Sequence, residues 1–234
     1  MYRKVPFAQD EYYHIYNRGV EKRSIFIDHK DRVRFLELLY LCNGTIPINL
    51  RDIREFMKDE NIFDFPRGNP LVAIGTYCLM GNHFHMLLRQ LTDKGISRFM
   101  QKLSTAYTMH FNKKYERSGA LFRGVFMDRY VGDDDYLKYL FAYIHLNPVE
   151  HIELNWKEQG IRDSKGAMAY LSQYSFSGLI DYVGEERPEC AILNVKKFPE
   201  YFRTKMDVKD HLENWLDFQK SGRAEEDLAY LLKN

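Results

Sequence analysis

The segment from residue 71 to residue 88 constrains the fold of this chain more than any other. Residues 71–80 form an almost continuous apolar run, which is typical of a central strand in a sheet. Gly81 and Asn82 follow as a two-residue turn signal, and residues 83–88 have the character of a second strand. The segment therefore predicts a β-hairpin, around which the other elements must pack.

The other predicted elements come from hydrophobic periodicity and from signals at helix ends. They are strands at 12–17 and 124–131 and helices at 29–42, 95–113 and 133–147. The last helix must end near Asn147, because Pro148 cannot continue it. The order strand, helix, strand, strand, helix, strand is the ferredoxin-like plan, an α+β fold with helices on one face of an antiparallel sheet. The helix at 133–147 is additional to that plan.

Two regions lie outside this pattern. Residues 44–70 are rich in proline and glycine, contain one short helical stretch near 50–60, and are interpreted as an insertion. After Glu150 the character changes, and a capping box at Thr204 and Asp207 predicts a late amphipathic helix. We therefore expect a main domain over 1–150 and a C-terminal extension, partly helical, over 151–234.

Composition narrows the class of protein. Residues 1–150 carry 22 Lys and Arg against 18 Asp and Glu, whereas residues 151–234 carry 12 against 15. This mild basic bias of the first part is compatible with a polyanionic partner without requiring one. The three cysteines form neither a disulfide framework nor a zinc motif. No apolar run approaches the roughly 18 residues of a membrane span, and the N-terminus does not resemble a secretory signal. We expect no membrane partner and a cytoplasmic protein, associated with the nucleoid in a prokaryote.

His83 and His85 are the first candidate site residues. Side chains two positions apart on a strand point to the same face, so these imidazoles lie side by side while Phe84 turns into the core. Two imidazoles on a rigid strand supply half of a divalent metal site and need an oxygen ligand from another element. The pattern is short, and accidental pairs are common, so the histidines alone do not establish a metal site.

The helix at 133–147 supplies the second candidate group. Tyr139, Tyr143 and Asn147 are spaced by four and share one helix face. A tyrosine can attack a phosphodiester when a metal polarises the phosphate, and an asparagine amide oxygen can ligate that metal. The alternative is that the tyrosines only pack, and that Asn147 is a C-cap. Tyr107, on the helix at 95–113, is a competing nucleophile candidate, and Tyr139 is a weaker one.

Four blocks of sequence, taken together, resemble the REP-associated tyrosine transposases, which are relatives of the single-tyrosine transposases of insertion sequences. The blocks are residues 13–19, residues 80–88, residues 107–112 together with Leu121-Phe122-Arg123-Gly124, and residues 143–149 with the sequence Tyr-Ile-His-Leu-Asn-Pro-Val. They occur in the family's order, and the resemblance covers roughly residues 10–182. One departure is that Arg123 and Val125 stand where the family often has glutamine and arginine.

The resemblance implies a ferredoxin-like HUH nuclease core. It assigns His83, His85 and Asn147 to a Mg²⁺ or Mn²⁺ site, and Tyr143 to the role of nucleophile. The implied reaction is cleavage and rejoining of single-stranded, hairpin-containing DNA through a 5′-phosphotyrosine intermediate. A homodimer stays open, because some relatives exchange the tyrosine helix between copies and others act as monomers.

Basic side chains in the main domain are candidates for contact with DNA phosphates, with tyrosine stacking on unpaired bases. They are Arg18, Lys102, Lys113, Lys114, Arg117, Arg123 and Arg129, together with Tyr107 as a stacking residue. Two other functions remain compatible with the residues: a hairpin-binding module without catalysis, and a metal-dependent nuclease that forms no covalent intermediate. An active mobile element and a domesticated descendant would have the same sequence features.

Overall fold

The computed structural model describes residues 6–58, 60–184, 186–202 and 204–220. Within these residues, four strands form one antiparallel sheet in the order β2-β3-β1-β4. The strands are β1 Tyr12–Arg18, β2 Val72–Leu79, β3 His83–Gln90 and β4 Met127–Val131. β2 and β3 are consecutive antiparallel neighbours, which confirms the predicted hairpin. β2 is buried along its whole length, as expected of its apolar run.

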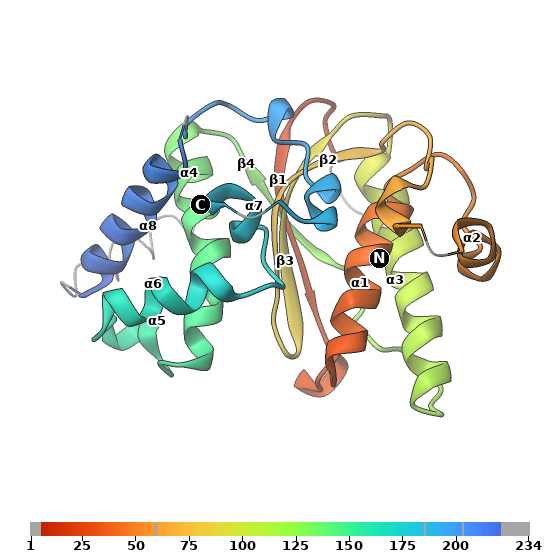
Figure 1. Cartoon of the computed structure of the whole chain (residues 1–234), viewed down its shortest axis with the longest axis horizontal. Helices are drawn as coiled ribbons and strands as arrows, with labels where there is room; N and C mark the ends of the chain where they lie inside the picture. The colour runs from red at the N-terminus through yellow and green to blue at the C-terminus, as the bar shows by residue number, and fades with distance from the viewer. Residues whose placement is uncertain (1–5, 59, 185, 203, 221–234) are drawn as a thin grey trace.

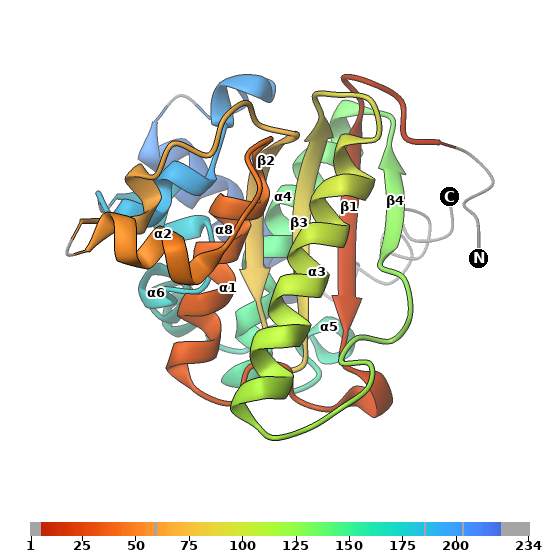
Figure 2. The same cartoon turned by 90° about the vertical axis from the view of Figure 1, so that its right-hand side faces the viewer.

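Helices cover both faces of this sheet (Figure 1). On one face lie α1 His29–Cys42 and α3 Gly95–Lys114, which run side by side across the strands (Figure 2). Their apolar sides bury Phe35, Phe99 and Tyr107 against the sheet. The order β1-α1-β2-β3-α3-β4 therefore confirms the α+β, ferredoxin-like prediction. The insertion at 44–70 contains α2 Leu50–Met57 and the 3-10 turn η2 Ile62–Asp64, and η2 contacts both α1 and α2.

The opposite face of the sheet is covered by α4 Asp134–Leu146 and by the C-terminal extension. The Asp133 side chain caps α4 by accepting a hydrogen bond from the Tyr136 amide. On α4, the buried ring of His145 hydrogen-bonds with the Thr76 hydroxyl of β2. Leu137, Leu140 and Ile144 pack with it against the sheet. These contacts fix the position of α4 relative to the strands.

The C-terminal extension consists of helices and 3-10 turns. They are α5 Trp156–Gln159, α6 Ser164–Gln173, α7 Leu179–Val183 and α8 Lys205–Lys220, with 3-10 turns η3 Asn147–His151, η4 Pro188–Ile192 and η5 Val195–Lys197; the remaining turn, η1 Val20–Lys22, follows β1. Of these elements, α8 and η3 contact α4, while η4 contacts α1 and η5 contacts β2. Thr204 and Asp207 form the predicted capping box of α8, each side chain accepting from the other's amide. None of the described helices combines the length and apolar character that a membrane crossing requires.

Two element boundaries differ from the sequence prediction. The strand predicted over 124–131 begins only at Met127, because Gly124 has φ of 69° and its amide turns back to the Phe122 carbonyl. The helix predicted over 133–147 ends at Leu146, and Asn147 starts the 3-10 turn that contains Pro148. In both places a backbone turn interrupts the regular element just where the side-chain pattern would continue it.

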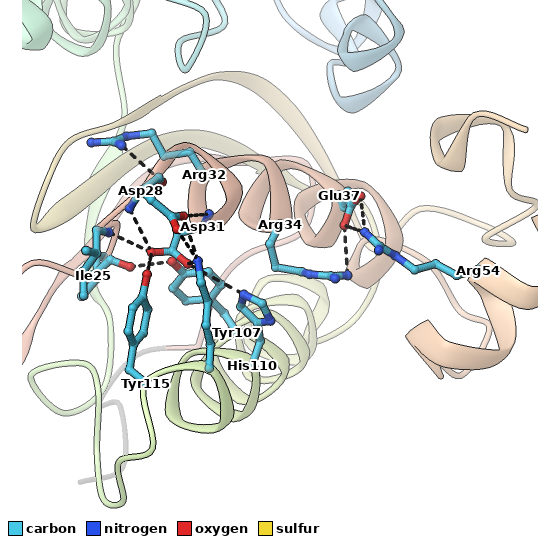
Figure 3. A network of polar contacts seen from close by, with 12 residues as sticks. Ile25, Asp28, Asp31, Arg32, Arg34, Glu37, Arg54, Tyr107, His110 and Tyr115 are labelled. Atoms are coloured by element: carbon cyan, nitrogen blue, oxygen red, sulfur yellow. Dashed lines mark hydrogen bonds and ion pairs between the residues drawn. The ribbon is translucent and has the colours of Figure 1, made fainter. Parts of the chain in front are cut away.

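A buried carboxylate joins α1 to α3 on the face away from α4 (Figure 3). Asp31, at the start of α1, is fully buried and accepts hydrogen bonds from the Lys114 ammonium, the Tyr115 hydroxyl and the Ile27 and Asp28 amides. Burial alone would raise the pKa of this carboxyl, but these donors and the charge of Lys114 hold its pKa below the ordinary value. The ionised form of Asp31 is therefore the form that stabilises the fold.

Replacement of Asp31 by alanine should lower the free energy of unfolding by about 3–5 kcal/mol near neutral pH, because it leaves the Lys114 charge without its buried partner. Since the pKa of Asp31 is depressed on folding, the stabilisation is present above the unfolded pKa of about 4 and is lost as pH falls below it. Urea denaturation measured at pH 7 and pH 3 should show a smaller difference between the two proteins at pH 3. Glu55→Ala, an exposed carboxylate on α2, is the control and should change little; a gap between wild type and Asp31→Ala that is equal at both pH values would contradict this account.

Candidate active site

The two predicted histidines lie on the sheet face that α4 covers. His85 of β3 pairs with Tyr16 of β1, and His83 pairs with Arg18. Their rings are perpendicular, with centroids 5.1 Å apart. His85 is 7% exposed and His83 is half-buried. The strand thus holds both imidazoles close together at the partly open end of this face.

Each imidazole is held at its Nδ1 atom. The Nδ1 of His83 lies 2.6 Å from the Oδ1 of Asn82, and the Nδ1 of His85 lies 2.9 Å from the Nε2 of His14. His14 comes from β1 and is buried; burial, together with the charge of Arg129, lowers the pKa of this imidazole to about 3. Sequence reasoning did not select His14 or Asn82. The signal that could have found His14 is its position two residues before Tyr16 on the strand that pairs with the histidine strand.

Tyr143 lies against the histidines within the same chain. Its ring centroid is 5.6 Å from that of His85 and 6.0 Å from that of His14, with the rings edge to face in both pairs. Tyr143 is half-buried. The helix that was predicted to carry the nucleophile therefore lies beside the two predicted histidines within one chain.

The other tyrosines of α4 are in a different environment. Tyr139 is 3% exposed, stacks on Tyr143 with centroids 5.9 Å apart, and meets Trp215 of α8 edge to face. Burial raises the pKa of the Tyr139 phenol well above its ordinary value. A phenol that is buried and resists ionisation is a poor nucleophile. Tyr139 therefore packs behind Tyr143.

Asn147 lies one turn beyond Tyr143, as the spacing predicted. It is fully buried, and its Nδ2 donates a hydrogen bond of 2.7 Å to the Tyr143 carbonyl. The amide oxygen is the side-chain atom of Asn147 with metal-ligand chemistry. Among the described residues, no three His, Cys, Asp or Glu side chains are grouped to hold a metal ion. A cation at His83 and His85 would consequently need a ligand of another type, and an asparagine oxygen fits that requirement.

A cavity of about 550 Å³ opens beside the histidines. Its lining residues are Tyr16, Asn17, Arg18, His83, His85, Arg123 and Met127. Arg18 and Arg123 bring positive charge to the cavity, and none of the lining side chains is acidic. Arg123 is held near the site by its backbone, because its amide donates to the Arg18 carbonyl. The cavity therefore has the charge and the flat aromatic surface that suit a phosphodiester with an adjacent base.

The remaining candidates for DNA contact are distributed elsewhere. Arg129 lies on the same sheet face, with its guanidinium 5.0 Å from the centroid of the Tyr136 ring. Lys113 is exposed at the end of α3. Arg117 donates to the Asn112 side chain and to the Ala120 carbonyl, so it closes the turn after α3.

Three candidates have structural partners that do not fit the predicted DNA contacts. Tyr107 is fully buried and its hydroxyl donates to the Ile25 carbonyl (Figure 3), so it can neither stack on a base nor act as nucleophile. Lys114 is bound to Asp28 and Asp31. The Lys102 ammonium donates to the carbonyls of Gly44 and Ile46, where it holds the start of the 44–70 segment. These side chains satisfy buried or partly buried acceptors, which the spacing of the sequence does not reveal.

Comparison with known proteins finds a family similarity over the middle part of the chain. The family model described as "Transposase IS200 like" matches residues 66–147, a span that contains both histidines, Tyr143 and Asn147. This match confirms the similarity to insertion-sequence transposases indicated by the sequence blocks. No curated protein matches the chain.

One solved structure that aligns with the chain is described as "Structure of the REP associates tyrosine transposase bound to a REP hairpin". It is 14% identical, with a TM-score of 0.46, and the alignment covers 78% of this chain and 84% of that one.

Because Tyr107 is part of the core, Tyr107→Phe should lower the free energy of unfolding by about 1–3 kcal/mol, since the buried Ile25 carbonyl loses its donor. Hairpin DNA binding by the folded variant should be unchanged. Tyr130→Phe is the matched control, because its hydroxyl donates to Glu11 at an exposed position, and it should cost about 0.5 kcal/mol or less. Thermal denaturation measures the stability of both variants, and a fluorescence assay measures their affinity for hairpin DNA. A loss of DNA affinity in folded Tyr107→Phe would show that Tyr107 contacts DNA after all.

Proposed function

We propose that this protein is a DNA transposase that cleaves and rejoins single-stranded, hairpin-containing DNA with Tyr143 as nucleophile. The observation that carries the proposal is the position of Tyr143, whose ring lies against His85 within one chain. The match of residues 66–147 to IS200-like transposases supports the same assignment. The hairpin in the substrate follows from the resemblance of the sequence blocks to the REP-associated tyrosine transposases, and it is part of the proposal.

The chemistry follows from the residues around Tyr143. The phenol oxygen would attack the scissile phosphorus, a new O–P bond would form, and the bond from phosphorus to the 3′ oxygen would break. The phenol loses one proton, and the leaving 3′ oxygen gains one to become the 3′-OH. The 5′ phosphate stays bonded to Tyr143. Rejoining is the reverse step, so the reaction needs no external energy source. A Mg²⁺ or Mn²⁺ ion bound by His83, His85 and Asn147 would supply polarisation of the scissile phosphate.

Arg18 and Arg123 would hold the phosphate backbone in the cavity beside the histidines. Tyr16, which lies face to face with His85 at a centroid distance of 5.6 Å, gives the cavity an aromatic wall. Tyr139 would support the nucleophile from behind by stacking on it. In this assignment each residue around Tyr143 either positions the phenol or binds the strand.

The first test is a covalent-adduct assay with labelled single-stranded hairpin DNA and Mn²⁺, read on a denaturing gel. Wild type should form a protein–DNA adduct, whereas Tyr143→Phe and His83→Ala should form none. Tyr139→Phe is the matched control on the same helix and should keep the adduct, because it removes a hydroxyl that plays no part in the reaction.

Each other outcome identifies a different function. Cleavage without an adduct in the wild type would indicate a metal-dependent nuclease. Binding without cleavage would indicate a hairpin-binding module. An adduct that persists in Tyr143→Phe would show that another side chain is the nucleophile.

The second test concerns the arginines of the cavity. Arg18→Ala and Arg123→Ala should each weaken binding of single-stranded DNA and reduce the slope of log affinity against log salt by about 0.7, the value for one phosphate contact on a single strand. Arg51→Ala, on the exposed side of α2, should leave both quantities unchanged. Titrations at several salt concentrations measure the slope, and equal slopes for all the variants would remove the arginines from the interface.

A further inference from the structure

The hydrogen bond between Asn82 and His83 fixes the proton position on His83. Asn82 Nδ2 donates to the Lys22 carbonyl at 3.1 Å, so the amide orientation is determined and its Oδ1 faces His83. A carbonyl oxygen only accepts hydrogen bonds, and the Nδ1 of His83 must therefore carry the proton. In the neutral ring, the lone pair is then on Nε2.

The turn that carries Asn82 is held rigidly by backbone hydrogen bonds. The Gly19 amide donates to the Asn82 carbonyl at 2.9 Å, and the Ile25 and Phe26 amides donate to the Gly81 carbonyl at 3.0 and 3.1 Å. The Gly-Asn turn is thus anchored to the segment after β1 on both of its residues. Asn82 presents its side-chain oxygen to His83 from a fixed position.

The Nδ1 of His85 also has a hydrogen-bond partner, the Nε2 of His14. His14 lies diagonally across the β1–β3 pair, since Tyr16 is the residue directly opposite His85. The two imidazoles are stacked with centroids 5.1 Å apart and share the Nδ1–Nε2 hydrogen bond. Two proton arrangements satisfy that bond. Only the one in which His85 Nδ1–H donates to His14 leaves a lone pair on the Nε2 of His85.

We propose that Asn82 and His14 are positioning residues that hold His83 and His85 as Nδ1–H tautomers, so that both Nε2 atoms offer lone pairs to one divalent cation. The proposal rests on the proposed function for the identity of the ligand. The two acceptors reach the histidines from different elements, the β2–β3 turn and β1. Proteins usually orient metal-binding histidines with a carboxylate, carbonyl or water acceptor at the non-ligating nitrogen, and the proposal gives this role to an amide oxygen at His83 and to an imidazole nitrogen at His85.

The direct test is the tautomeric state of both histidines in the metal-free wild-type protein, read from ¹⁵N chemical shifts in long-range ¹H–¹⁵N NMR spectra. We expect Nδ1–H and an unprotonated Nε2 on His83 and on His85. A proton on Nε2 of either neutral ring in the wild type would overturn the proposal, and this result needs no variant that might fail to fold.

The variant test uses two matched pairs. His14→Phe keeps a ring on the strand but removes the acceptor, whereas His14→Gln places an amide oxygen near the position of Nε2. Asn82→Ala removes the second acceptor, and Asn82→Asp keeps it. Mn²⁺ titrations followed by electron paramagnetic resonance should show a loss of affinity of about 10–100-fold for the Phe and Ala variants, with a return towards wild type for Gln and Asp.

The NMR readout on the same variants separates positioning from simple structural damage. His85 should lose its preference for Nδ1–H in His14→Phe and keep it in His14→Gln, and the folds should be the same by far-UV circular dichroism. Unchanged tautomers and Mn²⁺ affinity in folded His14→Phe and Asn82→Ala would overturn the proposal.

The experiments distinguish failure of the positioning roles of His14 and Asn82 from failure of the proposed transposase function. Expected tautomers and Mn²⁺ affinities in a wild-type protein that neither cleaves DNA nor forms an adduct would support the positioning roles and contradict the transposase. An adduct at Tyr143 with no effect of His14 or Asn82 on either readout would do the opposite.

Discussion

The antiparallel pairing of β1 with β3 is the interaction on which the site depends. Its register sets Tyr16 opposite His85 and Arg18 opposite His83, and it brings His14 within hydrogen-bonding distance of His85. A shift of β1 by one residue would turn His14, Tyr16 and Arg18 towards the core and bring Ile15 to the face of the histidines. The core between this sheet and α1 and α3, which buries Ile15 and Phe84 completely or almost so, is therefore what keeps the candidate site assembled.

The two faces of the sheet differ in character: one is packed with apolar side chains, and the other carries the candidate site. The face under α1 and α3 is apolar apart from a few paired groups, among which the buried Asp31 carboxylate joins the helices through Lys114 and Tyr115. The other face carries the histidines and the basic lining of the cavity, and α4 covers part of this face. Such a division allows a polar site on a small sheet, because packing on the first face stabilises strands whose second face is only partly covered.

Much of the fold could be predicted from the sequence because its signals are local. Apolar runs, alternation and capping residues placed the sheet and its helices, and the spacing of His83 with His85 and of Tyr143 with Asn147 placed the main site candidates. Contacts between distant segments have no such signature. His14 acts across a strand pair, and the bonds of Tyr107, Lys102 and Lys114 join elements far apart in the chain. Exposure of a basic or aromatic residue therefore could not be deduced from its type.

The contact of α8 with α4 has a mechanical consequence. Trp215 packs edge to face against Tyr139, and Tyr139 stacks on Tyr143. On the other side of α4, Leu140 and Ile144 are buried against the sheet. Lifting α4 away would expose these side chains at a cost of about 1.5–3 kcal/mol for each large apolar group. In this arrangement α4 is fixed between the sheet and α8. Under the proposed function, an end of DNA joined to Tyr143 would stay in place, and the new partner strand would have to move to it.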